Sequence, residues 1–331
     1  MAVPSVAAEL VEVSPEAADQ AFALGTEGDV DSMTGDERSS VLLNQAKAMI
    51  GTGRYPAASE FIDRADNEIS AREMVLRSSQ VRLKALLRLN RYPDALTVAE
   101  QVMKLLPDDD ELAAVEPLRD LNTIYRDLSD AENALGTARS LRHIAKNHPL
   151  ASMAASRVWR SIARTYAIYK PRKAIKAAKK ALVFAEDCGK LREIGNAYLA
   201  LGESRRHNSK LEKAISAYSQ SIDCARAIGN VESLLWATLG KADAELLAGD
   251  LDNAQSTLQK IKPFFSDEGR RHALEALHWN LSIAELAHVA NNEHKVDIDT
   301  LFDSYAELGI SWPAEYYRQL QTDGKSSPKP L

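Results

Sequence analysis

The sequence predicts an all-α protein built as a solenoid of stacked helix hairpins, and three observations lead to this prediction. First, Ala and Leu dominate the 331 residues and aromatic residues make up only 6%, which favours helices over strands because neither Ala nor Leu is β-branched. Second, a short pattern of a turn followed by Ala recurs along the chain at nearly constant spacing. Third, each interval between two such Ala residues contains two amphipathic helical segments.

The recurring pattern is a turn, then an aromatic residue or Leu, and three residues later an Ala at the start of a helix. Its clearest copies are Gly53–Ala58 and Asn90–Ala95, and the copies around 131–134 and 171–174 are weaker. Successive copies are separated by 37, 39, 40, 40 and 40 residues, which indicates a true repeat. The six Ala positions are Ala58, Ala95, Ala134, Ala174, Ala214 and Ala254.

Each repeat is predicted to be a pair of helices, as the segments 191–207 and 211–228 illustrate. In the first segment, Ile194, Tyr198 and Leu201 recur at helical spacing and mark one apolar face. The second segment has a similar apolar face and stops at Gly229, a residue type that tolerates the left-handed conformation of a helix C-terminus. A single hairpin cannot bury such faces, so stacked copies must bury them against one another.

The same repeat resembles the tetratricopeptide repeat, whose pattern is a bulky residue, Leu-Gly, then Ala and an aromatic residue. The residues that carry the resemblance are Tyr198, Leu201, Gly202, Ala214 and Tyr218. The resemblance covers roughly residues 40–310, and the long period is similar to a variant found in regulatory and adaptor tetratricopeptide proteins. It implies a right-handed superhelix in which the first helix of each hairpin lines a concave groove.

Composition along the chain predicts four regions. Residues 1–37 hold nine acidic residues and no basic ones, which predicts a mostly disordered acidic arm. Residues 38–310 are expected to form the solenoid, with about six to seven repeats. Residues 311–322 are expected to form a C-terminal capping helix, and residues 323–331 a flexible tail.

No motif in the sequence points to catalysis, a cofactor or a metal. A phosphate-binding Gly-rich loop and a Gly-x-Ser-x-Gly elbow are both missing. Cys188 and Cys224 have no partners at metal-ligand spacing and are interpreted as free thiols in a reducing compartment. The acidic run 108–111 is interpreted as the start of a helix, where negative charge is favourable. The sequence therefore predicts a protein that is not an enzyme.

The amino-terminal sequence resembles neither a secretory signal nor a transit peptide, because residues 1–24 contain no Lys or Arg and several acidic residues. No apolar run approaches the length of about 20 residues that a transmembrane helix needs. We therefore predict a cytoplasmic protein with no membrane insertion.

Charge is segregated along the chain, although the net charge of the whole is only −6. Residues 1–138 have a net charge of −12, residues 139–213 of +13, and residues 214–331 of −7. A block of one sign creates a local potential that attracts opposite charge. The basic block is therefore either a solvated helix surface or a binding surface for an acidic partner.

Basic residues recur at the positions that the tetratricopeptide resemblance directs towards the groove. Independently of the resemblance, the spacing of Arg157, Arg160 and Arg164 places all three on one helix face. Five lysines between 170 and 180 belong to a second helix and are expected on an outer face or rim, exposed to solvent. The predicted groove residues are Arg77, Lys84, Arg88, Arg119, Arg126, Arg157, Arg160, Arg164, Arg206 and His207.

These residues predict a non-enzymatic scaffold, adaptor or regulator that binds an acidic peptide or protein segment in a basic groove. Arginine suits this role because its planar guanidinium group grips carboxylates or phosphates through two hydrogen bonds. Two alternatives remain open, a nucleic-acid-binding helical repeat and a structural subunit that docks through its basic band. The residue set of the chaperone-binding carboxylate clamp does not match, since Asn122 falls one position away from the required place.

Two further expectations follow from the predicted groove. Reversing Arg157, Arg160 and Arg164 to Glu is expected to abolish ligand binding and to leave helicity unchanged, since exposed charges contribute little to folding. The acidic arm, residues 1–37, is a possible intramolecular competitor for the groove, because tethering gives it a high effective concentration. The other interpretation of the arm is a solubilising tail.

Overall fold

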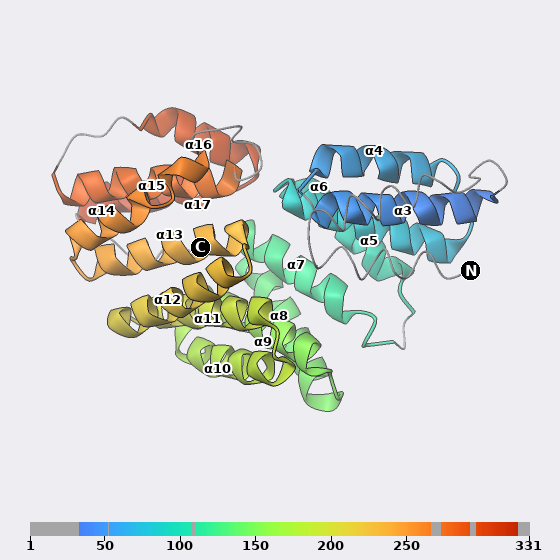
Figure 1. Ribbon diagram of the computed structural model, residues 1–331, viewed down its shortest axis with the longest axis horizontal. Coiled ribbons are helices and arrows are strands. Elements are labelled where there is room, and N and C mark those ends of the chain that lie inside the picture. Colours follow the sequence, from blue (N-terminus) through green and yellow to red (C-terminus); the bar gives the residue numbers. More distant parts are fainter. Residues whose placement is uncertain (1–32, 52, 108–109, 266–272, 292–295, 324–331) are drawn as a thin grey trace. The chain divides into compact units, whose positions relative to one another are not determined.

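A computed structural model describes most of the chain, and within the described residues the protein contains fifteen α-helices, one short 3-10 helix and no strand (Figure 1). The prediction of an all-α protein is therefore confirmed. The chain divides into two compact units, with the boundary between Pro117 and Leu118, and each unit is described by itself below. The described residues are 33–51, 53–107, 110–265, 273–291 and 296–323.

The first unit consists of two helix hairpins and the first residues of α7. Helix α3 packs on α4, α4 on α5, and α5 on α6. A proline lies in the first turn of α4 and of α6, where the missing N–H is not needed for the helix ladder. The helices are α3 (Gly35–Gly51), α4 (Tyr55–Asp66), α5 (Arg72–Arg88), α6 (Tyr92–Leu105) and α7 (Val115–Asp127).

In the second unit each helix from α8 onwards packs on the next in chain order, and α11 also contacts α9 and α13, and α15 contacts α13 and α17. Helices α9, α11, α13, α15 and α17 therefore form a continuous row, here called the first-helix row, to which hydrogen bonds from α9 join α7. After α7, the helices are α8 (Ala131–Asn147), α9 (Ser152–Tyr169), α10 (Pro171–Cys188), α11 (Leu191–Arg206), α12 (Leu211–Ala227), α13 (Val231–Leu247), α14 (Leu251–Gln259), η2 (Lys262–Phe265), α15 (Ala273–Val289), α16 (Ile298–Glu307) and α17 (Trp312–Asp323).

The Ala residues that define the repeat explain why the two helices of a hairpin can approach closely. All six are completely buried, at 0% exposure, and each lies in the first turn of a second helix or just after it. A larger side chain there would separate the helices, because protein interiors are packed to nearly crystalline density. The repeat recognised in the sequence therefore corresponds to the repeated packing unit of the structure.

The buried ring of Tyr218 on α12 packs closely against two glycines, one on each neighbouring first helix. A Cβ atom added to Gly202 on α11 would lie 2.7 Å from the ring, and one added to Gly240 on α13 would lie 2.6 Å from it. Only glycine leaves room for an aromatic ring at this distance. The Gly of the Leu-Gly pair, here Gly202, therefore leaves the space that the aromatic residue of the following helix, Tyr218, occupies.

The structure describes only some of the boundaries that the sequence predicts between regions. The structure describes helix α3 from Gly35 onwards and helix α17 from Trp312 to Asp323. Most of the predicted acidic arm and of the tail, residues 1–32 and 324–331, lies outside the described residues. A single solenoid over residues 38–310 stays a prediction, because the chain divides into two compact units within this range.

Candidate functional site

The main cluster of charged side chains in the second unit lies where α9 faces α11. Glu193, in the first turn of α11, is 2% exposed and accepts hydrogen bonds from two arginines of α9. Arg157 approaches one carboxylate oxygen at 2.7 Å, and Arg160 approaches the other at 3.2 Å. One buried carboxylate is thus held between two guanidinium groups.

Two further ion pairs continue along the same row of helices. Arg164 of α9 donates from Nε to Glu203 of α11 at 2.9 Å, and the carboxylate side chain is only 5% exposed. Arg206 of α11 donates to Asp243 of α13 at 2.7 Å, and these side chains are 0% and 4% exposed. Arginines therefore join α9 to α11 and α11 to α13.

The sequence analysis did not find these acidic partners, although their spacing carried a usable signal. Arg157 and Glu193 are separated by 36 residues, Arg164 and Glu203 by 39, and Arg206 and Asp243 by 37. A separation of about one repeat places two residues at equivalent levels on adjacent first helices. A search for opposite charges one repeat apart would have predicted these pairs.

Positive charge nevertheless exceeds negative charge around Arg160. Its pKa is lowered to about 10, first by desolvation and then by the positive charges of Arg119, Arg157 and Arg164, which outweigh the opposing effect of Glu193. Arg119, Arg157, Arg160 and Arg164 are here called the Arg cluster. Their mutual repulsion indicates a place where a further negative group would be stabilised.

The same charges act in the opposite direction on Glu193. Burial alone would raise the pKa of this carboxyl, but the hydrogen bond from Arg157 and the charges of Arg160, Arg157 and Arg119 outweigh burial and lower the pKa. Glu193 is therefore ionised at neutral pH and accepts from both of its arginine partners.

We predict that Glu193→Gln destabilises the protein by about 1 kcal/mol at pH 7, since a neutral acceptor replaces a charged one. Because the folded-state pKa lies below the ordinary value of 4.5, this stabilisation is fully present above pH 4.5 and is lost as the pH falls through the lowered folded-state value. Urea unfolding of both proteins between pH 7 and pH 3 measures the difference. A difference that stays constant over this range would contradict the assignment.

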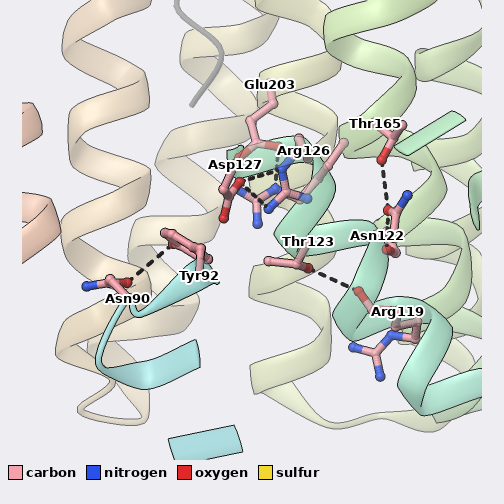
Figure 2. Close-up of polar contacts among 11 residues, drawn as sticks. Asn90, Tyr92, Arg119, Asn122, Thr123, Arg126, Asp127, Thr165 and Glu203 are labelled. Atoms are coloured by element: carbon pink, nitrogen blue, oxygen red, sulfur yellow. Dashed lines mark hydrogen bonds and ion pairs between the residues drawn. The ribbon is translucent and has the colours of Figure 1, made fainter. Parts of the chain in front are cut away.

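Asn122, which the sequence analysis compared with a ligand clamp, has a structural role (Figure 2). Its buried amide nitrogen donates to the Ala134 carbonyl at 2.8 Å and to the Thr137 hydroxyl at 2.9 Å. Its oxygen accepts from the hydroxyls of Ser161 at 2.7 Å and Thr165 at 2.8 Å. These contacts use all four hydrogen bonds that the amide can make and tie α7 to α8 and α9.

The other predicted residues of the second unit lie in different surroundings. Arg126 is 3% exposed and pairs with Asp127 at 3.0 Å (Figure 2). His207 is the residue that ends α11, and it lines a recess together with Lys170 at the start of α10. Neither residue belongs to the Arg cluster.

Three predicted residues lie on α5 in the first unit. Arg77 donates to Ser40 at 2.8 Å and to the amide oxygen of Asn44 at 2.7 Å, both on α3. Lys84 lies 3.8 Å from Glu116 in an exposed pair, and Arg88 is exposed. Their role in binding stays a prediction, separate from that of the Arg cluster.

The structure corrects the expectation of an open row of guanidinium groups. Arg206 is completely buried and Arg126 nearly so, and neither is accessible to a ligand in this conformation. The triple change of Arg157, Arg160 and Arg164 to Glu also has a different expected effect. It would place negative charges beside the buried carboxylates of the next helix, so loss of stability is expected where the sequence predicted none.

The described residues contain no arrangement of three or more His, Cys, Asp or Glu side chains that could hold a metal ion. Cys188 and Cys224 are half-buried and form no disulfide. No helix in the described part of the chain combines the length and the apolar character that crossing a bilayer requires.

Solved structures with a similar fold include a Rap protein in complex with the competence and sporulation factor, at 15% sequence identity and a TM-score of 0.68, covering 97% of this chain and 96% of that one. NprR in complex with its cognate peptide NprX matches at 15% identity and a TM-score of 0.64, with 97% and 95% coverage. Aspartyl phosphate phosphatase F from Bacillus subtilis matches at 16% identity and a TM-score of 0.54, with 98% and 91% coverage.

No protein-family model matches this chain, and no curated protein matches it in sequence. At such low identities the similarity to solved structures establishes the fold alone. It confirms the prediction of a tetratricopeptide-like helical-repeat protein.

Proposed function

We propose that this tetratricopeptide-like protein is a non-enzymatic regulator or adaptor that binds an acidic peptide segment against α7, α9 and α11 of its first-helix row. The observation that carries the proposal is the Arg cluster, in which desolvation and then the charges of Arg119, Arg157 and Arg164 lower the pKa of Arg160 to about 10. An acidic side chain or terminal carboxylate of a peptide would relieve this repulsion. Arg126 and Arg206, which the sequence also predicted for the groove, are instead buried in their own ion pairs.

The arginine side chains of α9 in the cluster are partly exposed to solvent. Arg157 and Arg164 have side chains that are 27% and 28% exposed, and Arg160 is 18% exposed. A guanidinium group has five N–H donors, and one carboxylate uses only two of them. The pairs with Glu193 and Glu203 therefore fix the orientation of the arginines, whose side chains stay partly exposed on this face.

The comparisons support a peptide as the ligand. The Rap structure contains the competence and sporulation factor, and the NprR structure contains its cognate peptide. A third protein of this fold is named a phosphatase, so the lack of enzymatic activity stays a prediction from the sequence. The cytoplasmic location stays a prediction from the sequence.

A selection from a random seven-residue peptide library displayed on phage tests the proposal. We expect selected peptides to be enriched in Asp and Glu, and to bind the Arg157→Gln/Arg164→Gln variant about ten-fold or more weakly, because each charge-assisted hydrogen bond contributes about 1.5–3 kcal/mol. Glu193 keeps Arg160 as a partner in this variant. The matched control is Arg139→Gln/Arg142→Gln on the exposed face of α8, which removes the same charge.

Fluorescence anisotropy of the selected peptides gives the affinities, and circular dichroism verifies that both variants are folded. Enrichment of Lys and Arg in the selected peptides, or equal loss of affinity in the control, would contradict the proposal. Single-stranded RNA and DNA oligomers test the nucleic-acid alternative. Their tight binding at physiological salt, with affinity falling steeply as salt rises, would support nucleic acid as the ligand instead.

A further inference from the structure

A second basic site lies on the other helices of the hairpins, where α10 begins. An open recess of about 540 Å³ is lined on one side by Lys170, Arg172 and Lys173. The turn between α11 and α12 lines the other side with His207, Asn208 and Ser209. None of the lining residues is acidic.

The two sides of the recess are fixed to each other by Asn208. Its side-chain nitrogen donates to the Pro171 carbonyl at 2.7 Å and to the Ser204 carbonyl at 2.8 Å. The first bond joins the α11–α12 turn directly to the first residue of α10. One hydrogen bond between neighbouring repeats therefore holds the two sides of the recess together.

The cations of this site differ from the arginines of α9 in their charge balance. Arg157, Arg160 and Arg164 all contact carboxylates, whereas no ion pair joins Lys170, Arg172 or Lys173 to an acidic side chain of the described residues. Arg172 and Lys173 are also exposed. The positive charge at the recess is thus not neutralised within the described chain.

The same surface continues along the first half of α10. Lys176 and Lys179 follow Lys173 at intervals of three residues, so they lie on the same side of the helix. Both are exposed, and within the described residues neither forms an ion pair. The next lysine, Lys180, differs because its ammonium group lies 4.2 Å from the centre of the Trp159 ring. The surface consists of an anchoring recess followed by a strip of two lysines.

The amount of charge at the recess favours phosphate over a carboxylate. Lys170, Arg172 and Lys173 line the recess together, and a single carboxylate would neutralise only one of their three charges. A phosphate monoester carries a charge of about −1.5 to −2 at pH 7 and has three strong acceptor oxygens. Lysine binds phosphate well as a point charge, and Arg172 adds a planar pair of donors. No aromatic side chain lines the recess for stacking a nucleic-acid base.

We propose that the recess formed by Lys170, Arg172 and Lys173 with the α11–α12 turn binds the phosphate group of a phosphorylated segment of a partner protein. Acidic residues next to the phosphorylated side chain lie along Lys176 and Lys179. This site is separate from the Arg cluster and has different residues. The protein then has two anion-binding surfaces, one on its first helices and one at the start of a second helix.

Fluorescence anisotropy with the full-length chain tests this proposal directly. The probe is a labelled seven-residue peptide with a central phosphoserine flanked by two Glu on each side, and the reference is the same peptide with unmodified Ser. We expect the phosphopeptide to bind about ten-fold more tightly than the reference. The Lys170→Gln/Lys173→Gln variant should lose this preference. The control variant Lys104→Gln/Lys260→Gln, which removes equal charge from exposed positions elsewhere, should keep it.

Three results would overturn the proposal. The first is equal binding of the two peptides by the wild-type chain, and the second is a preference that survives in Lys170→Gln/Lys173→Gln. The third is tighter binding of a single-stranded RNA oligomer than of the phosphopeptide, with the same two lysines required. The Arg157→Gln/Arg164→Gln variant keeps the preference for the phosphopeptide if the recess binds the phosphate, and loses it if the Arg cluster does. This variant therefore tests the proposal for the recess separately from the proposal for the Arg cluster.

Discussion

Replacing Asp243 with Ala is expected to destabilise the second unit by about 3–5 kcal/mol, the largest effect of any single change considered in this protein. Asp243 is 4% exposed and pairs with Arg206, which is completely buried. The Ser282 hydroxyl also donates to this carboxylate, at 3.2 Å. Removing the carboxylate leaves a guanidinium charge inside the protein without its principal partner, and water cannot solvate it there.

The double change Arg206→Met/Asp243→Leu distinguishes the loss of the ion pair from the cost of an unpaired buried charge. Apolar side chains of similar size remove both charges, so the double variant should be much closer in stability to the wild type than Asp243→Ala. Urea unfolding followed by circular dichroism measures all three proteins. Asp223→Ala, a change at an exposed carboxylate of α12, is the control and should stay within about 0.5 kcal/mol. A double variant less stable than Asp243→Ala would contradict the desolvation argument.

Gly240→Ala is expected to destabilise the second unit by about 1–3 kcal/mol, although Ala is the better helix former. The added Cβ would lie 2.6 Å from the ring of Tyr218 and 3.0 Å from its hydroxyl oxygen. Gly202 confines the same ring from α11, with 2.7 Å for its own added Cβ. The ring therefore cannot move towards α11 to relieve the clash.

Gly136→Ala on α8 is the matched control for this change. A Cβ there would meet only the end of the Arg139 side chain, at 3.8 Å, so the variant should gain stability, by up to about 1 kcal/mol, from helix propensity. A second variant, Tyr218→Leu/Gly240→Ala, should lose less stability than the sum of its single changes, because Leu removes the ring atoms that clash. Equal effects of Gly136→Ala and Gly240→Ala in thermal unfolding would show that Tyr218 does not restrict this position.

The repeat and the helices could be predicted from the sequence because they depend on local patterns. The six Ala residues at spacings of 37 to 40 marked the hairpins, and all six are completely buried. Glycine and Asn at the ends of the segments correctly indicated turns, as Gly229 and Asn90 show with their positive φ angles. These signals lie within a few residues of each other, so they need no knowledge of distant partners.

The sequence predicted the helix face of the charged residues but not their ion-pair partners. The spacing of Arg157, Arg160 and Arg164 correctly placed them on one helix face, and all three contact acidic residues of α11. Their partners, Glu193 and Glu203, lie one repeat further along the chain. The net charge of residues 139–213 includes both carboxylates, but it does not show that they pair with the arginines of α9 in particular.

The sequence by itself determined the helix class, the period of the repeat and the arginine face of α9. The tertiary structure alone decided which cations are compensated: Arg206 became a buried partner of Asp243, while Lys173 at the start of α10 stayed exposed. The physical reason is that burial and ion pairing depend on what the adjacent repeat places opposite a side chain. Helix periodicity fixes the direction of a residue on its own helix, but only the stacking of neighbouring hairpins supplies the opposite charge and excludes water.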